Sequence, residues 1–224
     1  GKNFFFCIQY QFGHCPNFMT TKEKIFTKAL ELFNNEGVEY VGMRELAAHL
    51  NMRVSNITYY YPTKDDLVFA ISQGLKEANS KIVVENDNIT LLAFLNMLKQ
   101  VFHNHVKYRC LLLSFVHLME QNKVIKSQYK KTASSRNMAI SANISHLIKN
   151  GFLKFKDKSD VEYLVSSLSL IIRFWISEAA VSQSRLSVEN QIHHYLILTA
   201  KTIQPYTSKK GEKELLHFLA GLQA

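Results

Sequence analysis

Proline and glycine are scarce in this chain of 224 residues, which contains three prolines and eight glycines. Two of the prolines, Pro16 and Pro62, lie in the first third, so no proline interrupts a helix between residues 63 and 204. A chain of this length can bury a substantial apolar core, as one large domain or as two small ones. The composition therefore predicts an all-α protein.

Cysteine and long apolar runs are also lacking. The three cysteines, Cys7, Cys15 and Cys110, are odd in number and lack the spacing of a disulfide framework, which favours a reduced, cytoplasmic setting. No apolar run approaches the roughly 18–20 residues that a membrane span needs, because Arg173 and several serines interrupt the longest candidate at 163–176. We therefore expect a cytoplasmic protein that has no membrane partner.

Motifs for catalysis and for cofactor binding are missing as well. The chain has no glycine-rich phosphate loop, no nucleophile elbow, and no Cys/His or carboxylate pair at an informative spacing. Among its nine histidines, His103 and His105, like the adjacent His193 and His194, fall on different faces of a helix, which disfavours a shared metal ion. We expect neither an enzyme nor a bound cofactor or metal.

Positive charge is distributed unevenly along the chain. The formal net charge is +9, yet residues 19–86 carry eight Lys or Arg against nine Asp or Glu, whereas residues 87–224 carry eighteen against nine. The basic excess thus lies in the later part of the chain. Net charge alone gives little support for a nucleic-acid partner, so any prediction of one must rest on local sequence pattern.

The first eighteen residues differ in character from the rest of the chain. They combine one lysine with an apolar patch that is too short for the core of a signal peptide, and no cleavage pattern of small residues comes after it. Met19 directly precedes a predicted helix start and fits a natural first residue. Residues 1–18 are therefore expected to be an N-terminal extension from an upstream start or a cloning artefact.

Apolar residues at helical spacing predict three short helices near the N-terminus, succeeded by longer ones. Thr20 and Glu23 form a capping box for the first helix, which runs to about residue 35. The second and third helices, predicted at 43–50 and 54–60, are joined by a tight turn at Asn51. Further helices are predicted at 63–84, 90–108, 110–120, 123–150, 160–182, 188–206 and 212–222.

Several helix ends carry their own signals. Gly37 and Gly151 suit the left-handed conformation that commonly stops a helix. Thr63 is predicted to cap the fourth helix, and Ser159 with Glu162 to form a capping box for the helix at 160–182. The helix boundaries can thus be predicted from local chemistry as well as from apolar spacing.

The second and third helices have the dimensions of a helix-turn-helix unit. Their apolar residues Leu46, Ala47, Leu50, Met52 and Ile57 can fix the angle between the two helices. The exposed face of the later helix then carries small and polar side chains, which suit the major groove of DNA. The sequence therefore predicts a DNA-reading element in this segment.

These residues resemble a known family. Gly37, the run RELAA at 44–48 and the run NITYYYPTKDDL at 56–67 are together similar to the N-terminal domain of the TetR (tetracycline-repressor-like) family of transcriptional regulators. The resemblance covers about 20–81, and its most specific part is the tyrosine-rich helix end with the Pro-x-Lys-x-x-Leu pattern directly after it. The departures from the family pattern, which affect base preference rather than fold, are Asn51, Ser55 and Thr58.

The resemblance implies an all-α fold of about nine to ten helices, in which an N-terminal helix-turn-helix domain precedes a helical ligand-binding and dimerisation domain. We expect the DNA-binding domain at 19–66, a connecting helix at 67–86, and the effector-binding and dimerisation domain at 87–224. The polar stretch at 85–88 marks the boundary between the two domains.

The resemblance also implies which side chains meet DNA. Arg53, Ser55 and Asn56 open the reading helix, where Arg suits guanine and Asn suits adenine. Hydroxyl and lysine side chains nearby can bind phosphates. The residues expected to contact DNA are Met43, Arg44, Arg53, Ser55, Asn56, Thr58, Tyr59, Tyr60 and Lys64.

Simpler interpretations remain open for part of this set. One of the three tyrosines is expected to pack in the core, and Tyr61 is the best candidate because the family has a buried Phe there. Lys64 can be an ordinary surface lysine, and Arg44 can pair with Glu45 or Glu39 instead of approaching DNA.

The later helices are implied to hold a ligand cavity and a four-helix dimer interface. Ordinary core packing is the favoured interpretation of each cavity candidate, since Met and aromatic side chains fill protein interiors with or without a ligand. The cavity candidates are Phe94, Met97, Leu98, Phe102, His105, Phe115, His117, Met119, Met138, Ile144, Phe174 and Trp175. The interface candidates are Leu164, Leu168, Ile172, Ile176, Tyr195, Leu196 and Thr199.

The function implied is that of a DNA-binding transcriptional regulator. We expect a homodimeric repressor that a small-molecule effector of unknown identity releases from a palindromic operator, with half-sites about 34–36 Å apart. Two alternatives stay open, a helix-turn-helix DNA-binding protein without a small-molecule ligand and an all-α enzyme.

Overall fold

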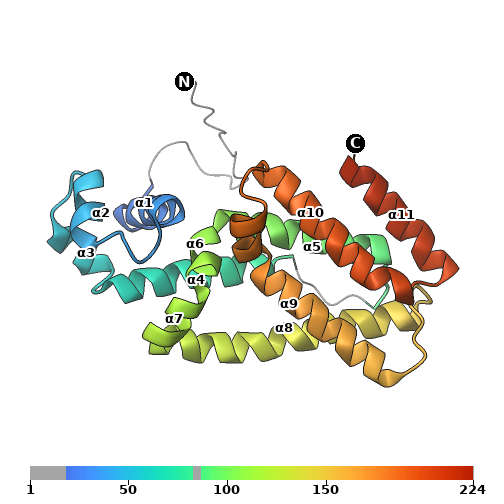
Figure 1. Ribbon diagram of the computed structural model, residues 1–224. Coiled ribbons are helices and arrows are strands. Elements are labelled where there is room, and N and C mark those ends of the chain that lie inside the picture. Colours follow the sequence, from blue (N-terminus) through green and yellow to red (C-terminus); the bar gives the residue numbers. More distant parts are fainter. Residues whose placement is uncertain (1–18, 83–86, 224) are drawn as a thin grey trace.

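The computed structural model describes residues 19–82 and 87–223; the expected extension at 1–18, with Cys7 and Cys15, lies outside them. The described residues form eleven α-helices, one 3-10 helix and no β-strand, so the all-α class is confirmed. In Figure 1, α1–α3 group at one end, α4 leads away from them, and the later helices form the rest of the body. In chain order the elements are α1 (Thr21–Glu36), α2 (Met43–His49), α3 (Val54–Tyr60), α4 (Lys64–Ser80), α5 (Leu91–Lys107), α6 (Arg109–Leu113), α7 (Phe115–Gln121), α8 (Lys123–Lys149), α9 (Lys158–Ser182), α10 (Val188–Ile203), η1 (Gln204–Tyr206) and α11 (Lys209–Gln223).

The first helix begins and ends where local chemistry predicts. The Thr20 hydroxyl accepts a hydrogen bond from the backbone N–H of Glu23 at 3.2 Å, and the Glu23 carboxylate accepts from the Thr20 N–H at 2.8 Å. This capping box satisfies two backbone donors that a helix start leaves unpaired. Gly37 comes directly after the helix with a φ of +99°, a value that side chains rarely allow.

The turn between α2 and α3 depends on one residue in the left-handed region. Asn51 has a φ of +52° and is the only non-glycine residue with positive φ among those described. The Asn51 N–H donates to the Ala48 carbonyl at 3.1 Å, and the Met52 N–H donates to the Ala47 carbonyl at 2.9 Å. Because Asn tolerates this conformation better than most residues, it can replace the more usual glycine and hold α3 at a fixed angle to α2.

Helix α4 starts as predicted and ends earlier. Thr63 and Asp66 form a reciprocal capping box, with hydrogen bonds of 3.1 and 3.0 Å between side chain and backbone. The helix ends at Ser80, so the predicted end near residue 84 is wrong. The Ser80 hydroxyl donates to the Glu77 carbonyl at 2.9 Å, a local bond that competes with continuation of the helix.

The single helix predicted at 110–120 is wrong, because the chain breaks there into α6 and α7. The break falls at Ser114, a buried residue that departs from helical geometry with a φ of −87° and a ψ of 16°. Its hydroxyl donates to the Glu39 carboxylate at 2.8 Å, across from the loop between α1 and α2. The interruption of this helix thus coincides with a contact between residues far apart in the sequence.

The predicted capping box at the start of α9 is also absent. The chain is already helical at Lys158, with Asp157 in the N-cap position, so Ser159 and Glu162 lie inside the helix. The predicted end of the preceding helix is confirmed: α8 ends at Lys149, and Gly151 follows shortly after it with a φ of +75°.

The C-terminal helix packs against the turn after α8. Pro205 lies in η1, so α10 ends at Ile203 instead of continuing to 206, and α11 begins at Lys209, ahead of the predicted residue 212. A Cβ atom at Gly211 would collide with the backbone carbonyl of Phe152. The contact between α11 and this turn therefore requires a residue without a side chain at 211.

Short helix α6 connects the N-terminal helices with the rest of the body. The Asn34 side chain in α1 donates to the Lys107 carbonyl at 2.8 Å and accepts from the Cys110 N–H at 3.0 Å. On the other side, the Ser177 hydroxyl of α9 donates to the Leu112 carbonyl of α6 at 3.0 Å. Helix α6 is therefore hydrogen-bonded to α1 and to α9 together.

Much of the apolar surface of α9 faces away from the protomer's own core. By length and composition alone, α9 is the one described helix that could cross a membrane, but only 28% of its apolar 18-residue window is buried. Leu170 is 58% exposed and Val181 is 82% exposed. Burial of these side chains would require contact with another molecule or with residues outside the described ranges.

Candidate functional site

Helix α3 presents a polar tip on a short apolar base. Ile57 is the only buried residue of this helix, and its first turns carry Arg53, Ser55 and Asn56 on the exposed side. Arg53 occupies the N-cap position and makes no capping bond with its side chain. A short helix that exposes an arginine and an asparagine at its N-terminal end can offer bidentate donors and acceptors to base edges.

The tyrosines at the end of α3 divide into exposed and buried positions. Tyr59 is 81% exposed and lies edge-to-face against exposed Tyr60, with ring centroids 5.0 Å apart. Tyr61 is buried, as predicted, and burial raises the pKa of its phenol. The Thr58 hydroxyl donates to the Ser55 carbonyl at 3.3 Å, so it is engaged within α3. Tyr59 and Tyr60 are thus the hydroxyl groups best placed to bind phosphate.

Lys64 is held against its own domain. The ammonium group donates to the Glu39 carbonyl at 3.4 Å and lies 5.9 Å from the centre of the Phe33 ring. Partial burial lowers the pKa of Lys64, and the charges of Glu39 and neighbouring acidic residues oppose that shift. Lys64 is therefore neither an extended surface lysine nor, in this conformation, a freely projecting phosphate ligand.

Met43 and Arg44 lie at the start of α2. Met43 is half-buried and Arg44 is exposed. Among the described residues Arg44 forms no salt bridge with Glu45 or Glu39, the two partners considered from the sequence. Its guanidinium is available to an external anion, as the DNA-contact prediction requires.

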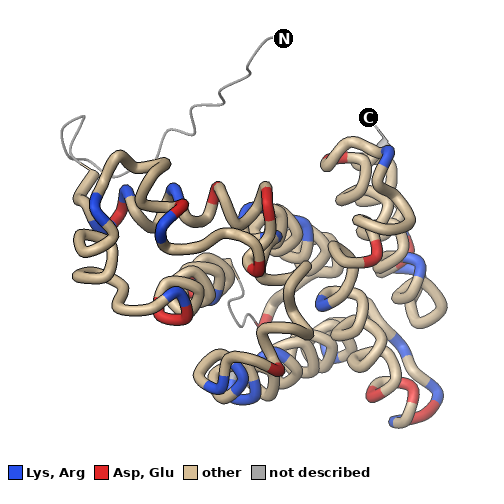
Figure 2. Tube along the Cα trace, turned by 60° about the vertical axis from the view of Figure 1, so that its left-hand side comes forward, with Lys and Arg blue, Asp and Glu red and all other residues tan. Residues whose placement is uncertain are grey.

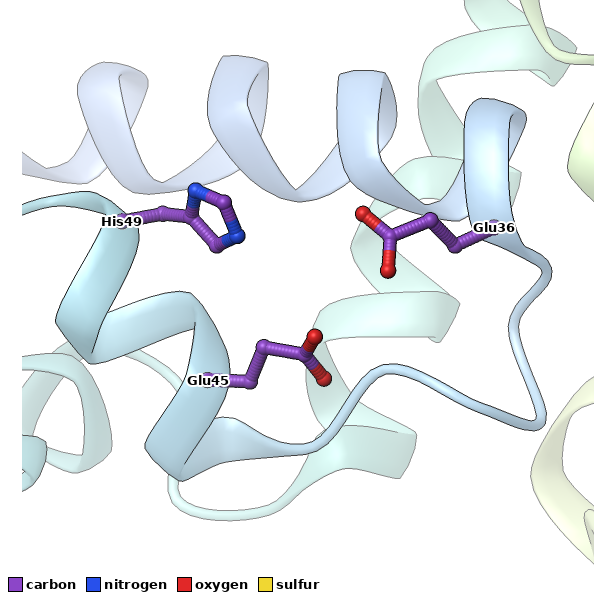
Figure 3. Close-up of side chains that lie close together, drawn as sticks. All are labelled: Glu36, Glu45 and His49. Atoms are coloured by element: carbon purple, nitrogen blue, oxygen red, sulfur yellow. The ribbon is translucent and has the colours of Figure 1, made fainter.

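Two carboxylates and an imidazole lie together between the end of α1 and α2. Figure 3 shows Glu36, Glu45 and His49 pointing toward one another, with ligand atoms within 4.8 Å. The i,i+4 spacing of Glu45 and His49 places them on one helix face, a signal that the histidine pairs considered from the sequence did not include. Since all three are exposed and Glu45 also accepts from the Gly42 N–H at 3.4 Å, we assign this group no ligand.

Charges of both signs are mixed over the N-terminal helices. Figure 2 shows basic and acidic positions interleaved there, in agreement with the near balance of charge counted over residues 19–86. The N-terminal helices therefore do not form a broad basic surface. The predicted DNA contacts depend on individual side chains of α2 and α3, not on a basic surface.

Several of the predicted cavity residues meet in a filled aromatic core. The Phe102 and Trp175 rings are stacked at 4.7 Å, and the Trp175 indole N–H donates to His105 Nδ1 at 3.1 Å. Burial, together with the positive charge of Arg136, lowers the pKa of His105 to about 3. His105 is therefore a neutral acceptor inside the protein.

A second cluster of aromatic side chains lies beside this core and contains two arginines. Phe115 packs edge-on against Tyr129 at 4.8 Å and against Phe174 at 5.8 Å. The guanidinium carbon of Arg136 lies 4.8 Å from the centre of the Tyr129 ring, and that of Arg173 lies 5.7 Å from it. Of these five residues the sequence prediction included only Phe115 and Phe174. The signal for Arg173 was a charge within the most apolar part of α9.

The other cavity candidates are not brought together. Phe94, Leu98 and Ile144 are buried, and Met97 and Met119 are half-buried. His117 is exposed, and Met138 is 69% exposed on the wall of an open surface groove of about 580 Å³ between α8 and α9. Neither His117 nor Met138 can therefore line an interior cavity in this conformation.

The predicted dimer residues mostly belong to the protomer's own core. Only Ile172 is half-buried, and the six buried ones are Leu164, Leu168, Ile176, Tyr195, Leu196 and Thr199. The predicted interface residues thus lie mostly on the inward faces of α9 and α10, because apolar spacing cannot show which face of a helix packs inward. The apolar side chains that α9, α10 and the segment between them expose are Tyr163, Leu170, Val181, Leu186, Val188 and Leu198.

Comparison with known families identifies two consecutive matches. The family described as "Bacterial regulatory proteins, tetR family" matches residues 25–71. The family described as "Bacterial transcriptional repressor" matches residues 72–215, which is more than half of the chain. The first match contains α2 and α3, and the second contains both aromatic clusters.

Individual proteins give the same result. Over 95 residues the chain is 30% identical to a protein of Bacillus subtilis (strain 168) named "Probable HTH-type transcriptional regulator YttP"; the match covers 39% of this chain and 46%, about half, of that protein. A TetR-family transcriptional regulator from Marinobacter aquaeolei VT8 superposes with a TM-score of 0.83 at 20% identity, covering 91% of this chain and 99% of that one. A gamma-butyrolactone receptor (ArpA-like protein) superposes with a TM-score of 0.65 at 11% identity, covering 89% and 94%.

Proposed function

The chain belongs to the tetR family of bacterial regulatory proteins and is a DNA-binding transcriptional regulator; from this we propose that it is a homodimeric repressor released from a palindromic operator by a small molecule. In this proposal α3 reads the bases, α2 and the tyrosines position it on phosphates, and the helices after α4 bind the effector and the second subunit. The protein acts in the cytoplasm, where its operator lies, and it performs no catalysis.

The observation that carries the proposal is the exposed polar tip of α3. Ile57 fixes the helix from below, while Arg53, Ser55 and Asn56 are exposed at its N-terminal end. A second copy related by twofold symmetry would place its own α3 in the next major groove on the same side of the duplex, about 34–36 Å away.

Asn56 provides the sharpest test of base reading. We expect Asn56→Ala to reduce the preference for the operator over a scrambled duplex by about 1–3 kcal/mol, or roughly 5- to 150-fold, because a bidentate contact to a base is lost. Fluorescence anisotropy with the promoter fragment upstream of the protein's own coding region measures both affinities. The matched control is Asn35→Ala, an exposed asparagine of α1, which should leave the ratio unchanged. Equal ratios for the two variants would show that α3 does not read the operator through Asn56.

The exposed apolar side chains of α9 and α10 support a dimer interface on the surface that these two helices form. Leu170 is 58% exposed and Leu198 is 44% exposed, although both belong to predominantly apolar helices. Because burial of such residues is the main source of stability in obligate dimers, the partner proposed for this face is a second copy.

Introducing charge on that face provides a direct test. We expect Leu170→Lys combined with Leu198→Lys to convert the dimer into a folded monomer, since a buried lysine pair across the interface cannot be compensated while exposed positions tolerate lysine. Analytical ultracentrifugation gives the mass and circular dichroism the fold. Leu216→Lys, at a 53% exposed leucine of α11, is the control and should remain dimeric. A double variant that is still a dimer would move the interface to another face.

Release of the operator is proposed to occur through a shift between two domain arrangements. An effector that binds one arrangement more tightly draws the protein toward it, and operator affinity falls if the two α3 helices no longer fit successive grooves. Helix α4 and the hydrogen-bonded helix α6 connect the N-terminal helices to the rest of the chain. That a gamma-butyrolactone receptor has the same fold supports a small-molecule effector.

A further inference from the structure

Arg173 is an unusual residue for its position. It lies in α9 between Ile171, Ile172 and Phe174, Trp175, in the most apolar stretch of the chain. The side chain is half-buried, and its Nε atom is buried without a hydrogen-bond partner among the described residues. A buried N–H that loses water without gaining an acceptor costs free energy, so the Nε–H of Arg173 calls for a partner.

A second guanidinium faces the same aromatic ring. Arg136 extends from α8 to lie 4.8 Å from the centre of the Tyr129 ring, and Arg173 lies 5.7 Å from that centre and 5.8 Å from the centre of the Phe174 ring. Contacts with aromatic faces compensate part of the cost of removing a cation from water. They leave the charge itself in place, so the two arginines and their aromatic neighbours form a cationic, partly apolar site.

No carboxylate neutralises this pair within the described chain. Neither arginine takes part in a salt bridge, and the nearest acidic residues along the adjoining helices, Glu120 in α7 and Glu178 in α9, are exposed. Arg136 stays exposed to solvent, yet partial desolvation of its guanidinium lowers its pKa; Tyr129 opposes that shift, and the positive charge of Arg173 adds to it. Two like charges that face one aromatic ring without a carboxylate partner would be stabilised by an anion from outside the chain.

We propose that Arg136 and Arg173 bind the acid group of an amphipathic effector, a carboxylate or a phosphate, whose apolar part lies against Phe115 and Phe174. The planar guanidinium fork matches both oxyanions, and the edge-to-face rings of Phe115, Tyr129 and Phe174 supply the apolar wall. This inference rests on the proposed function, because it names the chemical class of the effector in that scheme. It also places the ligand beside α9, the helix that is hydrogen-bonded to α6.

The test uses the full-length dimer and three probes of equal chain length, namely octanoate, octyl phosphate and octan-1-ol. We expect isothermal titration calorimetry to detect one or both acids and to show that the alcohol binds at least about 10-fold more weakly, because charged hydrogen bonds are lost. The tighter of the two acids identifies the head group. Binding of octan-1-ol as tight as that of the acids, or binding of no acid at millimolar concentration, overturns the proposal.

Substitutions locate the site. Arg173→Gln and Arg136→Gln are each expected to weaken acid binding about 10-fold or more while leaving octan-1-ol unchanged. Arg185→Gln, at an exposed arginine after α9, is the matched control and should bind the acids as the unmodified protein does. If Arg173→Gln does not fold, Arg136→Gln carries the comparison, because Arg136 retains exposure to solvent. Unchanged acid affinity in the folded arginine variants rejects the assignment.

Two further measurements separate this inference from its premises. In the absence of ligand, Arg173→Met is expected to raise Tm, because it removes an unneutralised charge from an apolar setting; a lower Tm would assign the arginine to a structural role. Operator binding is measured separately by anisotropy. A protein that binds the acids but no operator fails the proposed function and keeps the anion site, whereas one that binds the operator but no acid fails only the anion-site inference.

Discussion

Ile57→Ala is expected to lower the free energy of unfolding of the N-terminal helices by about 2–5 kcal/mol and to abolish operator binding. Ile57 is fully buried and is the only buried residue of α3, a helix of seven residues. A helix this short is not stable alone, so its position depends on the side chain that anchors it to α1 and α2. Removing three methyl or methylene groups from that anchor leaves a cavity beneath the whole reading element.

The measurement is urea denaturation monitored by circular dichroism, together with hydrogen exchange of the α2 and α3 amides. Tyr40→Ala is the control, since it deletes a larger side chain from the same region at a position that is 81% exposed. We expect the control to change stability by less than about 0.5 kcal/mol and to retain DNA binding. A stable, DNA-binding Ile57→Ala protein would mean that contacts other than this one hold α3.

Acidification is expected to destabilise the protein through His105. The folded-state pKa is lowered from 6.5 to about 3 by burial and by the charge of Arg136, so the unfolded chain binds the proton more readily. Stability from this residue is complete above pH 6.5 and is lost as the pH falls from 6.5 toward 3. In that window the slope is about 1.4 kcal/mol per pH unit, and the total loss is several kcal/mol.

Comparing two histidine variants with the unmodified protein separates the contribution of His105 from that of the carboxylates, which also bind protons on acidification. His105→Gln keeps an acceptor for the Trp175 indole N–H but cannot bind a proton, so its stability should fall less steeply between pH 6 and pH 4. His103→Gln, at an exposed histidine of the same helix, should behave like the unmodified protein. Parallel pH profiles for His105→Gln and the unmodified protein would contradict a neutral buried His105.

Several features of the fold that depend on neighbouring residues were predictable from the sequence, although the capping box predicted for Ser159 and Glu162 was wrong. The capping boxes at Thr20 and Thr63 and the left-handed turn at Asn51 each involve residues within three or four positions of one another. These features can therefore be predicted without knowledge of the fold. The family resemblance rested on the same segment, which explains why the regulator class could be predicted.

Features that depend on distant residues were not predictable. The break at Ser114 coincides with a hydrogen bond to Glu39, which lies 75 positions away. The burial of most predicted dimer residues in the protomer could not be foreseen for a related reason, because an apolar helix such as α9 shows the same spacing on its inward and outward faces. In the sequence Arg173 is only an interruption of an apolar run; its significance emerges once Arg136 and Tyr129 lie beside it.

The way α6 is attached has a mechanical consequence. A helix of five residues is too short to bend, and Asn34 and Ser177 hold it by its backbone from opposite sides. A displacement of α9 relative to α1 is therefore expected to move α6 as a unit or to break one of these hydrogen bonds. Intermediate positions are disfavoured, so the orientation of the reading helices should switch in discrete steps instead of drifting with small movements of the ligand-binding helices.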